Sequence, residues 1–338
     1  MRDAGYDVRY LTGTGRFGKA RALRSLIKEE SPDLVYTSLF DADLAGSLAT
    51  IGIDVPLISN LVNTAYDPAR LADPNIDRRR LKVVKWIDGF TARHMTDHFH
   101  AVSQAVKDST VENLGVDPDR ITVVKRGRDS GRLGRRTPER ATAARVMLRI
   151  PQTAEVVVTV GRQEYQKGHP YLIEAFAGVV ASRPNARLLI VGREGHSTAA
   201  LERLITEFDL DSVVTLLGHR SDVAEVLAAS DLFAFPSLYE GLGGALIEAL
   251  ALGLPVVATD LPALREVVHE GENAVLIPPG DSDALRSAIV TLLEDPGTMA
   301  RFGGRSRELF EEEFRIEDST DRMITMLTAV EAGTTHKS

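Results

Sequence analysis

Two segments of the chain carry charged side chains at spacings that suit chemistry on an anion. The first is the run Gly161-Arg-Gln-Glu-Tyr-Gln-Lys-Gly168, which follows the apolar stretch 156–160. Its first glycine lets backbone approach a ligand closely, while Arg162 and Lys167 add a planar guanidinium and a mobile ammonium. Pro170 is typical of the first turn of a helix. Because cations beside a helix N-terminus bind anions, this loop predicts a diphosphate site.

The second segment is 236–255, in which Glu240 precedes a predicted helix at 244–252 and Glu248 lies about one turn inside it. The first turn of a helix leaves amides without internal partners, so they are free to donate to phosphate. Two carboxylates beside a phosphate site repel a nucleotide unless they meet hydroxyl groups. We therefore expect a sugar nucleotide, with Glu248 on the ribose diol and Glu240 on the sugar. The predicted backbone donors are Gly241, Leu242, Gly243 and Gly244.

Each of these four charged residues, taken singly, is explained equally well as a solvated surface charge. Their occurrence together in two motifs favours a binding site over that explanation.

Short apolar runs alternate with helical patterns along the chain, which predicts an open α/β architecture. Runs such as Val156-Val-Val-Thr-Val160 are apolar throughout, as are strands of a parallel sheet buried on both faces. The predicted strands are 6–11, 34–37, 57–61, 121–124, 156–160, 187–191, 213–217, 232–235 and 255–259, and the clearest helical patterns are 171–182, 199–208, 221–229 and 316–330.

A stretch rich in arginine and glycine, between Arg126 and Arg149, predicts the connection between two Rossmann-like, doubly wound domains. We expect a first domain at 1–137 and a second at 138–315, facing a cleft at the carboxyl ends of their strands, where ligands bind. The helical pattern at 316–332 is expected to cross back to the first domain, and residues 333–338 to form a flexible tail.

Composition excludes several functional classes. The 338 residues include no cysteine, which rules out disulfides, thiolate nucleophiles and cysteine-based metal sites. The sequence has neither an apolar run of the roughly 18–20 residues that a membrane span needs nor a signal-peptide core, so we expect a cytoplasmic protein. The net charge of −8 divides into +6 for residues 1–150 (25 Lys/Arg, 19 Asp/Glu) and −14 for the remainder (15 and 29). An acidic chain without a long basic stripe argues against nucleic-acid binding, whereas the basic front half suits an anionic membrane surface or acceptor.

Several motifs in order resemble glycosyltransferase family 4. They are the Gly-Arg-x4-Lys-Gly element at 161–168, the Glu-x7-Glu element at 240–248, and the runs Ala101-Val-Ser103, Asp231-Leu-Phe-Ala-Phe-Pro-Ser237 and Glu270-Gly-Glu-Asn-Ala-Val-Leu-Ile-Pro-Pro-Gly-Asp281. The resemblance covers about residues 57–293. It implies a GT-B fold and a retaining, metal-independent transfer from a UDP- or GDP-sugar to a glycan or lipid-linked acceptor, without a cofactor.

The same resemblance assigns roles to individual residues. Arg162 and Lys167 would neutralise the diphosphate, which is the part a metal ion plays elsewhere. Glu248 would hold the ribose, Glu240 would contact the donor sugar, and the backbone near His219 and Arg220 would meet the nucleobase.

Three other patterns suggest competing interpretations. Gly13, Gly15 and Gly18 match the dinucleotide-binding fingerprint and leave an NAD-dependent oxidoreductase as an alternative, although a lone match of this kind is weak and a plain glycine turn explains it. His94, His98 and His100 have spacing that a metal would accept, but we interpret them as helix-end and strand-edge residues.

The third pattern is the basic, amphipathic stretch from Arg78 to Phe90, which holds the only tryptophan. It suits an interfacial helix on anionic lipid, with the protein peripheral on the inner face of the membrane, or an ordinary helix with a solvated basic face.

The start of the chain departs from the family pattern. Family members usually carry an apolar strand, a glycine-rich loop and a helix before the segment that stands here at Gly5–Val8. We expect either that the first domain is incomplete or that the given start is late, and that the sheet has an exposed edge. A truncated homologue that binds nucleotide sugars without transferring them is therefore an alternative. On the acceptor side, Arg126 stands where the family often has asparagine, and a histidine often found after Leu57-Ile-Ser-Asn60 is missing.

Overall fold

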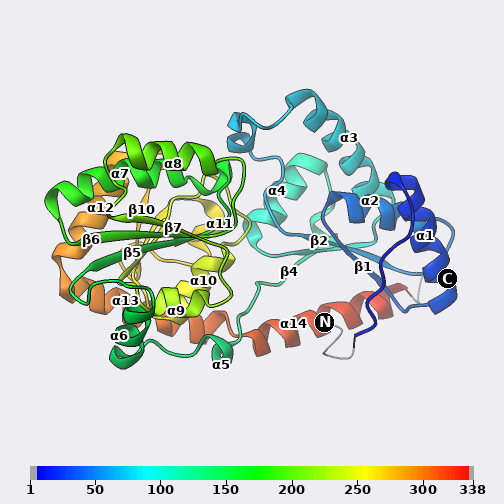
Figure 1. Cartoon of the computed structure of the whole chain (residues 1–338). Helices are drawn as coiled ribbons and strands as arrows, with labels where there is room; N and C mark the ends of the chain where they lie inside the picture. The colour runs from blue at the N-terminus through cyan, green and yellow to red at the C-terminus, as the bar shows by residue number, and fades with distance from the viewer. Residues whose placement is uncertain (1–5, 335–338) are drawn as a thin grey trace. The chain divides into compact units, whose positions relative to one another are not determined.

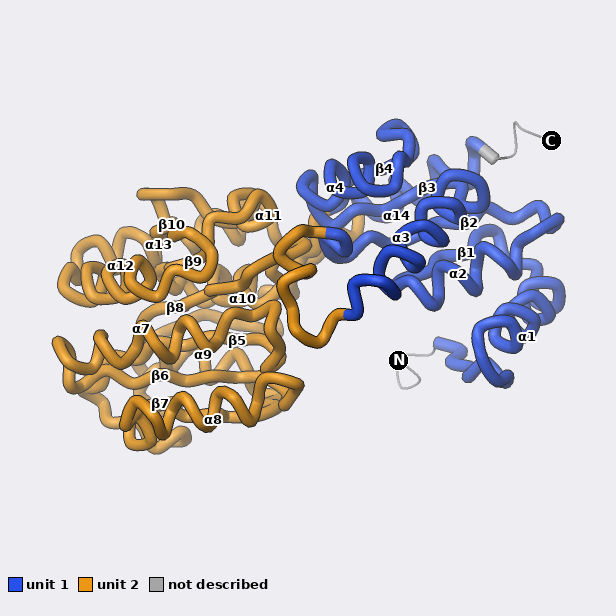
Figure 2. Tube along the Cα trace, turned by 90° about the horizontal axis from the view of Figure 1, so that it is seen from above, with its two compact units in different colours: residues 1–66, 77–124, 322–338 blue, residues 67–76, 125–321 orange. Residues whose placement is uncertain are grey.

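The computed structural model describes residues 6–334 and divides them into two compact units. Unit 1 comprises the described residues 6–66, 77–124 and 322–334, and unit 2 comprises 67–76 and 125–321 (Figure 2). The main part of unit 2 begins at Lys125, whereas the sequence suggested a boundary at 137–138. The last helix, α14 (Ile316–Thr334), includes Gly333 and Thr334, which the sequence placed in a flexible tail, and the remaining tail residues lie outside the described part.

Unit 1 is built on a parallel sheet of four strands in the order β1-β2-β3-β4. In the described part of the chain β1 pairs only with β2 and is therefore an edge strand of this sheet. The strands are β1 (Val35–Ser38), β2 (Leu57–Leu61), β3 (His98–Ala101) and β4 (Ile121–Val123), and the helices are α1 (Gly15–Glu30), α2 (Phe40–Ala49), α3 (Arg78–His94) and α4 (Gln104–Leu114).

Local capping explains where the helices of unit 1 begin and end. The Asp77 carboxylate accepts a hydrogen bond from the amide of Arg79 at 2.8 Å and starts α3. Ser103 does the same for Val106 at 3.1 Å and starts α4. Gly115, at φ 65°, ends α4 in the left-handed region that favours glycine.

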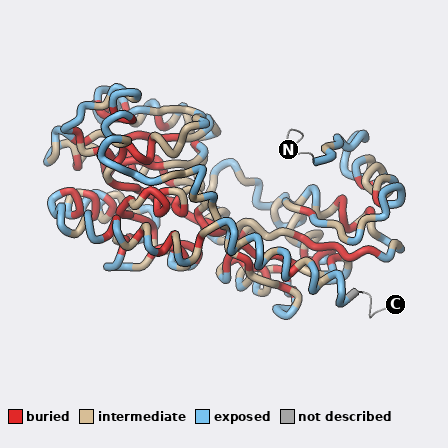
Figure 3. Tube along the Cα trace, turned by 90° about the horizontal axis from the view of Figure 1, so that it is seen from below, coloured by how far each residue is buried: buried red, intermediate tan, exposed pale blue. Residues whose placement is uncertain are grey.

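Unit 2 has a parallel sheet of six strands in the order β10-β9-β8-β5-β6-β7. Helices α7 and α8 cover one face and α9 and α10 the other (Figure 1). Buried residues concentrate along the strands between the two helical layers (Figure 3), so the prediction of strands buried on both faces is confirmed. The strands are β5 (Glu155–Val160), β6 (Ala186–Val191), β7 (Val214–Gly218), β8 (Leu232–Phe235), β9 (Val256–Thr259) and β10 (Ala274–Ile277). The helices are α5 (Ser130–Leu133), α6 (Pro138–Met147), α7 (His169–Ser182), α8 (Thr198–Glu207), α9 (Val223–Ala228), α10 (Gly244–Ala251), α11 (Pro262–Arg265), α12 (Ser282–Glu294) and α13 (Pro296–Glu313).

One predicted strand is wrong. Residues 6–11 form no strand, and the side chains of Tyr6 and Tyr10 are 68% and 84% exposed, so the apolar half of this segment has no sheet to cover it. Two strands were not predicted. β3 alternates histidine with apolar residues and so does not look like an apolar strand. β10 is an apolar run of only four residues, and the sequence analysis treated it only as part of the 270–281 motif.

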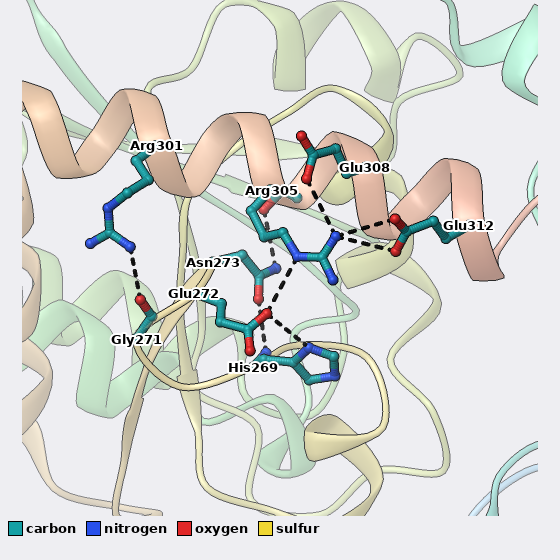
Figure 4. Close-up of polar contacts among 9 residues, drawn as sticks. His269, Gly271, Glu272, Asn273, Arg301, Arg305, Glu308 and Glu312 are labelled. Atoms are coloured by element: carbon teal, nitrogen blue, oxygen red, sulfur yellow. Dashed lines mark hydrogen bonds and ion pairs between the residues drawn. The ribbon is translucent and has the colours of Figure 1, made fainter.

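The 270–281 run is tied to α13 rather than to the charged loops of the sequence analysis. Asn273 is fully buried and donates to Ser306 Oγ at 3.2 Å, while its side-chain oxygen accepts from the His269 amide at 2.8 Å. Arg305 on α13 pairs with Glu272, and also with Glu308 and Glu312 (Figure 4). This part of the motif therefore anchors a turn in unit 2.

Candidate functional site

The loop after β5 is shaped by close backbone contacts at glycine positions. Gly192, at φ 154°, lies so near Gly161 that a Cβ on it would stand 1.8 Å from the Gly161 carbonyl oxygen. Gly168, at φ 62°, lies against Pro236, where a Cβ would stand 2.0 Å from the carbonyl oxygen. A larger residue at either position would push the loops apart. The 161–168 loop is therefore fixed against the end of β6 and the end of β8.

Backbone hydrogen bonds join the two charged loops that the sequence analysis singled out. The Leu238 amide donates to the Gln166 carbonyl at 2.8 Å, and the Gln166 side chain donates to the Tyr239 carbonyl at 2.9 Å. The residues at 161–168 and at 236–244 thus form one surface at the carboxyl ends of β5 and β8. This is the edge of a parallel sheet where ligands bind in open α/β folds.

Lys167 and Glu240 are brought into direct contact. The Lys167 ammonium forms an ion pair with Glu240 Oε1, and the same oxygen accepts from Ser237 Oγ at 2.8 Å. The side chains of Lys167 and Glu240 are 18% and 7% exposed, and the ammonium lies 5.2 Å from the centre of the Phe235 ring. Without a ligand, these two charges offset each other.

Arg162, the other cation of the 161–168 loop, differs from Lys167 in its exposure and its contacts. Its side chain is exposed, and within the described residues it makes neither an ion pair nor a side-chain hydrogen bond. The guanidinium is therefore available to an incoming anion at no cost in broken contacts.

The N-terminus of α10 has no side-chain cap. Gly243 precedes the helix at φ 81°, a backbone conformation that favours glycine. The amides of Gly244 and Ala245 make no hydrogen bond within the described residues, as expected in a first helical turn. The predicted helix at 244–252 is confirmed as Gly244–Ala251, with Glu248 about one turn inside it.

Glu248 has a partner that sequence reasoning missed. Arg128 Nε lies 2.8 Å from Glu248 Oε1, and the two side chains are 27% and 25% exposed. Arg128 stands in the arginine- and glycine-rich stretch that the sequence identified only as a connection. The one signal available was the number of arginines in that stretch.

Burial changes the protonation of one residue at the site. His169, the first residue of α7, is 1% exposed, and burial lowers its pKa to about 3, with the Lys167 charge adding to the effect. The imidazole is therefore neutral at pH 7, and its Nδ1 has no hydrogen-bond partner in the part of the chain that the structure describes. It adds no positive charge to the neighbouring loop.

The residues predicted to meet the nucleobase lie directly after β7. His219 is exposed, and Arg220 forms a bidentate pair with Asp222 at 2.6 and 2.8 Å. The structure brings Arg162, Lys167, Glu240 and Glu248 onto one unit.

The structure does not provide the context that the dinucleotide and metal-binding interpretations require. Gly15 opens α1, but no strand precedes the glycine motif in the described residues, as the dinucleotide fingerprint requires. The described part of the chain has no group of His, Asp and Glu residues that would hold a metal. His94 ends α3, as predicted. His98 and His100 lie on β3, an internal strand and not a sheet edge, where they bond to Thr122 Oγ1 at 2.8 Å and to the Val124 carbonyl at 2.9 Å.

The chain belongs to the glycosyl transferases group 1 family, whose model matches residues 141–309. The model described as Glycosyltransferase Family 4 matches residues 5–132.

Curated relatives carry glycosyltransferase names. The UDP-Gal:alpha-D-GlcNAc-diphosphoundecaprenol alpha-1,3-galactosyltransferase of Escherichia coli is 27% identical over 81% of this chain and 70% of its own length. A GDP-mannose-dependent monoacylated alpha-(1-6)-phosphatidylinositol monomannoside mannosyltransferase of Corynebacterium glutamicum is 35% identical over 72% of this chain and 61% of its own. A D-inositol 3-phosphate glycosyltransferase of Kineococcus radiotolerans is 30% identical, over 82% and 67%. The chain thus spans roughly two thirds of the length of these relatives.

Solved structures establish the fold class. HepE of Anabaena, in complex with UDP-glucose, matches with a TM-score of 0.85 at 24% identity, over 96% of this chain and 85% of its own. Sucrose-phosphate synthase of Thermosynechococcus elongatus matches with a TM-score of 0.81 at 22% identity, over 93% and 77%. The fold is GT-B, with two parallel-sheet α/β domains, as the resemblance implied.

Proposed function

We propose that the protein transfers a sugar from a UDP- or GDP-sugar to a glycan or lipid-linked acceptor, with retention of anomeric configuration and without a metal ion. The observation that carries the proposal is the joined surface at 161–168 and 236–248 in unit 2. It combines an uncommitted cation, uncapped helix amides and two carboxylates, which together suit a diphosphate flanked by hydroxyl groups. The names of the relatives support both a UDP-sugar and a GDP-sugar as donor class.

The proposed roles are those that the family resemblance implies for these residues. Arg162 and Lys167 stabilise the charge that develops on the departing diphosphate, the task a divalent cation has in other enzymes. Glu240 accepts hydrogen bonds from the donor sugar, and Glu248 from the ribose. The backbone at 219–220 meets the base.

The test is incubation of the full chain with a panel of UDP- and GDP-sugars and lipid-linked acceptors. We expect release of one nucleotide with formation of a glycoside whose anomeric proton, read by NMR, has the donor's configuration. The rate is expected to be unchanged by a chelator. Inverted product, or loss of activity that added metal restores, would contradict the mechanism. Tight nucleotide binding with neither transfer nor hydrolysis would instead support the non-catalytic homologue.

We also propose that α3 rests on an anionic lipid surface. Val83, Trp86 and Phe90 follow one another at helical spacing and are 59%, 71% and 47% exposed. The Trp86 and Phe90 rings stack with centroids 6.3 Å apart, and the exposed side chains of Arg79 and Lys82 lie near them in the sequence. Apolar and aromatic side chains beside basic ones are typical of helices at a membrane interface. No helix in the described residues is long and apolar enough to cross a bilayer.

Vesicle co-sedimentation tests the lipid surface. The wild-type chain is expected to sediment with vesicles that contain phosphatidylglycerol and to remain in solution with pure phosphatidylcholine. The variant Trp86→Ser/Phe90→Ser is expected to lose sedimentation. The matched control Val146→Ser/Met147→Ser removes two exposed apolar side chains (67% and 50%) from α6 of unit 2, and it should sediment as wild type. Equal sedimentation of both variants would contradict the proposal.

A further inference from the structure

The stretch that connects to unit 2 places an arginine beside the predicted ribose carboxylate. The Arg128 amide donates to the Phe314 carbonyl at 2.8 Å, and its carbonyl accepts from the Ile316 amide at 3.1 Å. Gly127 lies against the chain at Arg315, where a Cβ would stand 2.4 Å from the carbonyl oxygen. The backbone at Arg128 is therefore held firmly between α13 and α14, and its side chain starts from a fixed point.

The guanidinium of Arg128 reaches the first turn of α10. Its Nε donates to Glu248 Oε1 at 2.8 Å and its Nη1 to the Gly127 carbonyl at 3.1 Å. Its Nη2 lies so close to Gly244 that a Cβ there would stand 2.3 Å away. A guanidinium has five N–H donors, and the remaining ones make no hydrogen bond within the described residues.

Unused donors of Arg128 and the uncapped amides of Gly244 and Ala245 therefore meet at one place. A guanidinium beside uncapped amides at a helix N-terminus gathers hydrogen-bond donors that suit an anion, so this arrangement fits a phosphate group. Glu248 Oε1 accepts from Arg128, and a ribose diol that hydrogen-bonds to the same oxygen would compete with Arg128 for it.

We propose that Arg128 is a donor-binding residue, which holds Glu248 in place in the empty enzyme and binds the diphosphate when the ribose engages Glu248. The inference rests on the proposed function and adds to it a third cation of the nucleotide-sugar site. It predicts that Arg128 acts on the phosphate part of the ligand and not on the nucleoside part.

Calorimetric titration of UDP and uridine, or of GDP and guanosine where the wild-type chain prefers them, separates these parts. In Arg128→Gln we expect affinity for the diphosphate to fall roughly 10–100-fold, as for a lost charged hydrogen bond, and nucleoside affinity to stay within about threefold. Arg128→Lys keeps the charge and is expected to lose less. In Glu248→Gln, affinity for both ligands should fall.

Arg132→Gln is the matched control, because Arg132 lies four residues further along the same stretch and its exposed side chain makes no hydrogen bond or ion pair within the described residues. It should bind both ligands as wild type. Equal losses for diphosphate and nucleoside in Arg128→Gln would show that Arg128 only orients Glu248 and would overturn the proposal. Unchanged or tighter diphosphate binding, or equal losses in Arg128→Gln and Arg128→Lys, would overturn it as well. A wild-type chain that binds none of these ligands would refute the proposed function itself.

Discussion

The pair of Lys167 and Glu240 makes two predictions that can be measured separately, one for stability and one for binding. Both side chains are largely buried, and Ser237 donates to the same carboxylate oxygen. Removing the lysine breaks a largely buried ion pair, which costs about 3–5 kcal/mol. For a domain of this size, a loss of about 3 kcal/mol lowers the melting temperature by roughly 6–12 °C.

The perturbation is Lys167→Ala, compared with Glu240→Gln and with the double variant. The glutamine side chain that replaces Glu240 in the double variant carries no charge and still accepts from Ser237, so the double variant should recover most of the lost stability. The chain has a single tryptophan, Trp86, which lies in unit 1. Tryptophan fluorescence therefore follows the melting of unit 1, while circular dichroism follows both units and shows the shift of unit 2.

UDP or GDP binding gives the second measurement, because neither ligand has the donor sugar that Glu240 is proposed to contact. Glu240→Gln releases Lys167 from its partner, so this variant should bind the diphosphate at least as tightly as wild type. The double variant should then bind it roughly 10–100-fold more weakly than Glu240→Gln, the effect of losing one charged contact. If the double variant binds as well as Glu240→Gln, Lys167 serves only to offset Glu240, and its role on the diphosphate is refuted. If Lys167→Ala melts like wild type, the reasoning about the buried pair is refuted.

Three further outcomes are expected. Arg162→Ala should leave the melting temperature of unit 2 unchanged, because this exposed side chain has no partner among the described residues. The same variant should bind the diphosphate roughly 10-fold or more weakly. A lowered melting temperature would contradict the description of the site. In unit 1, burial raises the pKa of Asp43 to about 6, with a weaker contribution from the charge of Asp88. Between about pH 4 and 6 the folded state then binds more protons than the unfolded state. The free energy of unfolding of unit 1, followed by tryptophan fluorescence, should therefore fall by up to about 3 kcal/mol as the pH rises through that range. Asp43→Asn should flatten this pH profile, while the exposed Asp54→Asn should not. In unit 2 the lowered pKa of His169 has the opposite effect on the pH dependence: the free energy of unfolding should fall as the pH falls from about 6.5 toward about 3. Urea unfolding followed by circular dichroism over this pH range measures the effect. If His169→Gln shows the same loss as wild type, the prediction is contradicted.

Sequence pattern was sufficient for most of the fold because the strands of unit 2 are buried on both faces. β5 and β8 are almost entirely apolar, and such runs leave few alternatives. The prediction was wrong at residues 6–11, where alternating Tyr and Val residues suggested a strand and the structure has none. β3 was missed because His98 and His100 look polar, although hydrogen bonds to Thr122 and Val124 satisfy both rings inside the sheet.

The candidate site was predictable in its residues but not in its contacts. Arg162, Lys167, Glu240 and Glu248 lie on motifs whose spacing can be read directly. The pairing of Lys167 with Glu240 depends on the register by which Gly168 packs against Pro236, which no spacing records. Arg128 was beyond prediction, because its position is fixed by the chain at 314–316, far along the sequence.

The charge arrangement of unit 2 suggests why a whole nucleotide sugar should bind better than its parts. In the empty site, Lys167 is paired with Glu240 and Arg128 with Glu248, whereas Arg162 makes no ion pair within the described residues. A diphosphate alone attracts the cations but separates Glu240 and Glu248 from the cations that pair with them, and a free sugar or nucleoside bonds to the carboxylates but offers the cations no counter-charge. Because leaving a charged group without a partner is costly, the broken ion pairs offset much of the binding free energy of either part alone. We therefore expect inorganic diphosphate to compete weakly with UDP-sugar or GDP-sugar in a displacement titration. The variant Arg128→Gln/Glu248→Gln removes one ion pair entirely, so the difference in affinity between inorganic diphosphate and the nucleotide sugar should be smaller in this variant. Diphosphate that competes as strongly as the full nucleotide sugar would show that the two pairs do not couple the halves of the ligand.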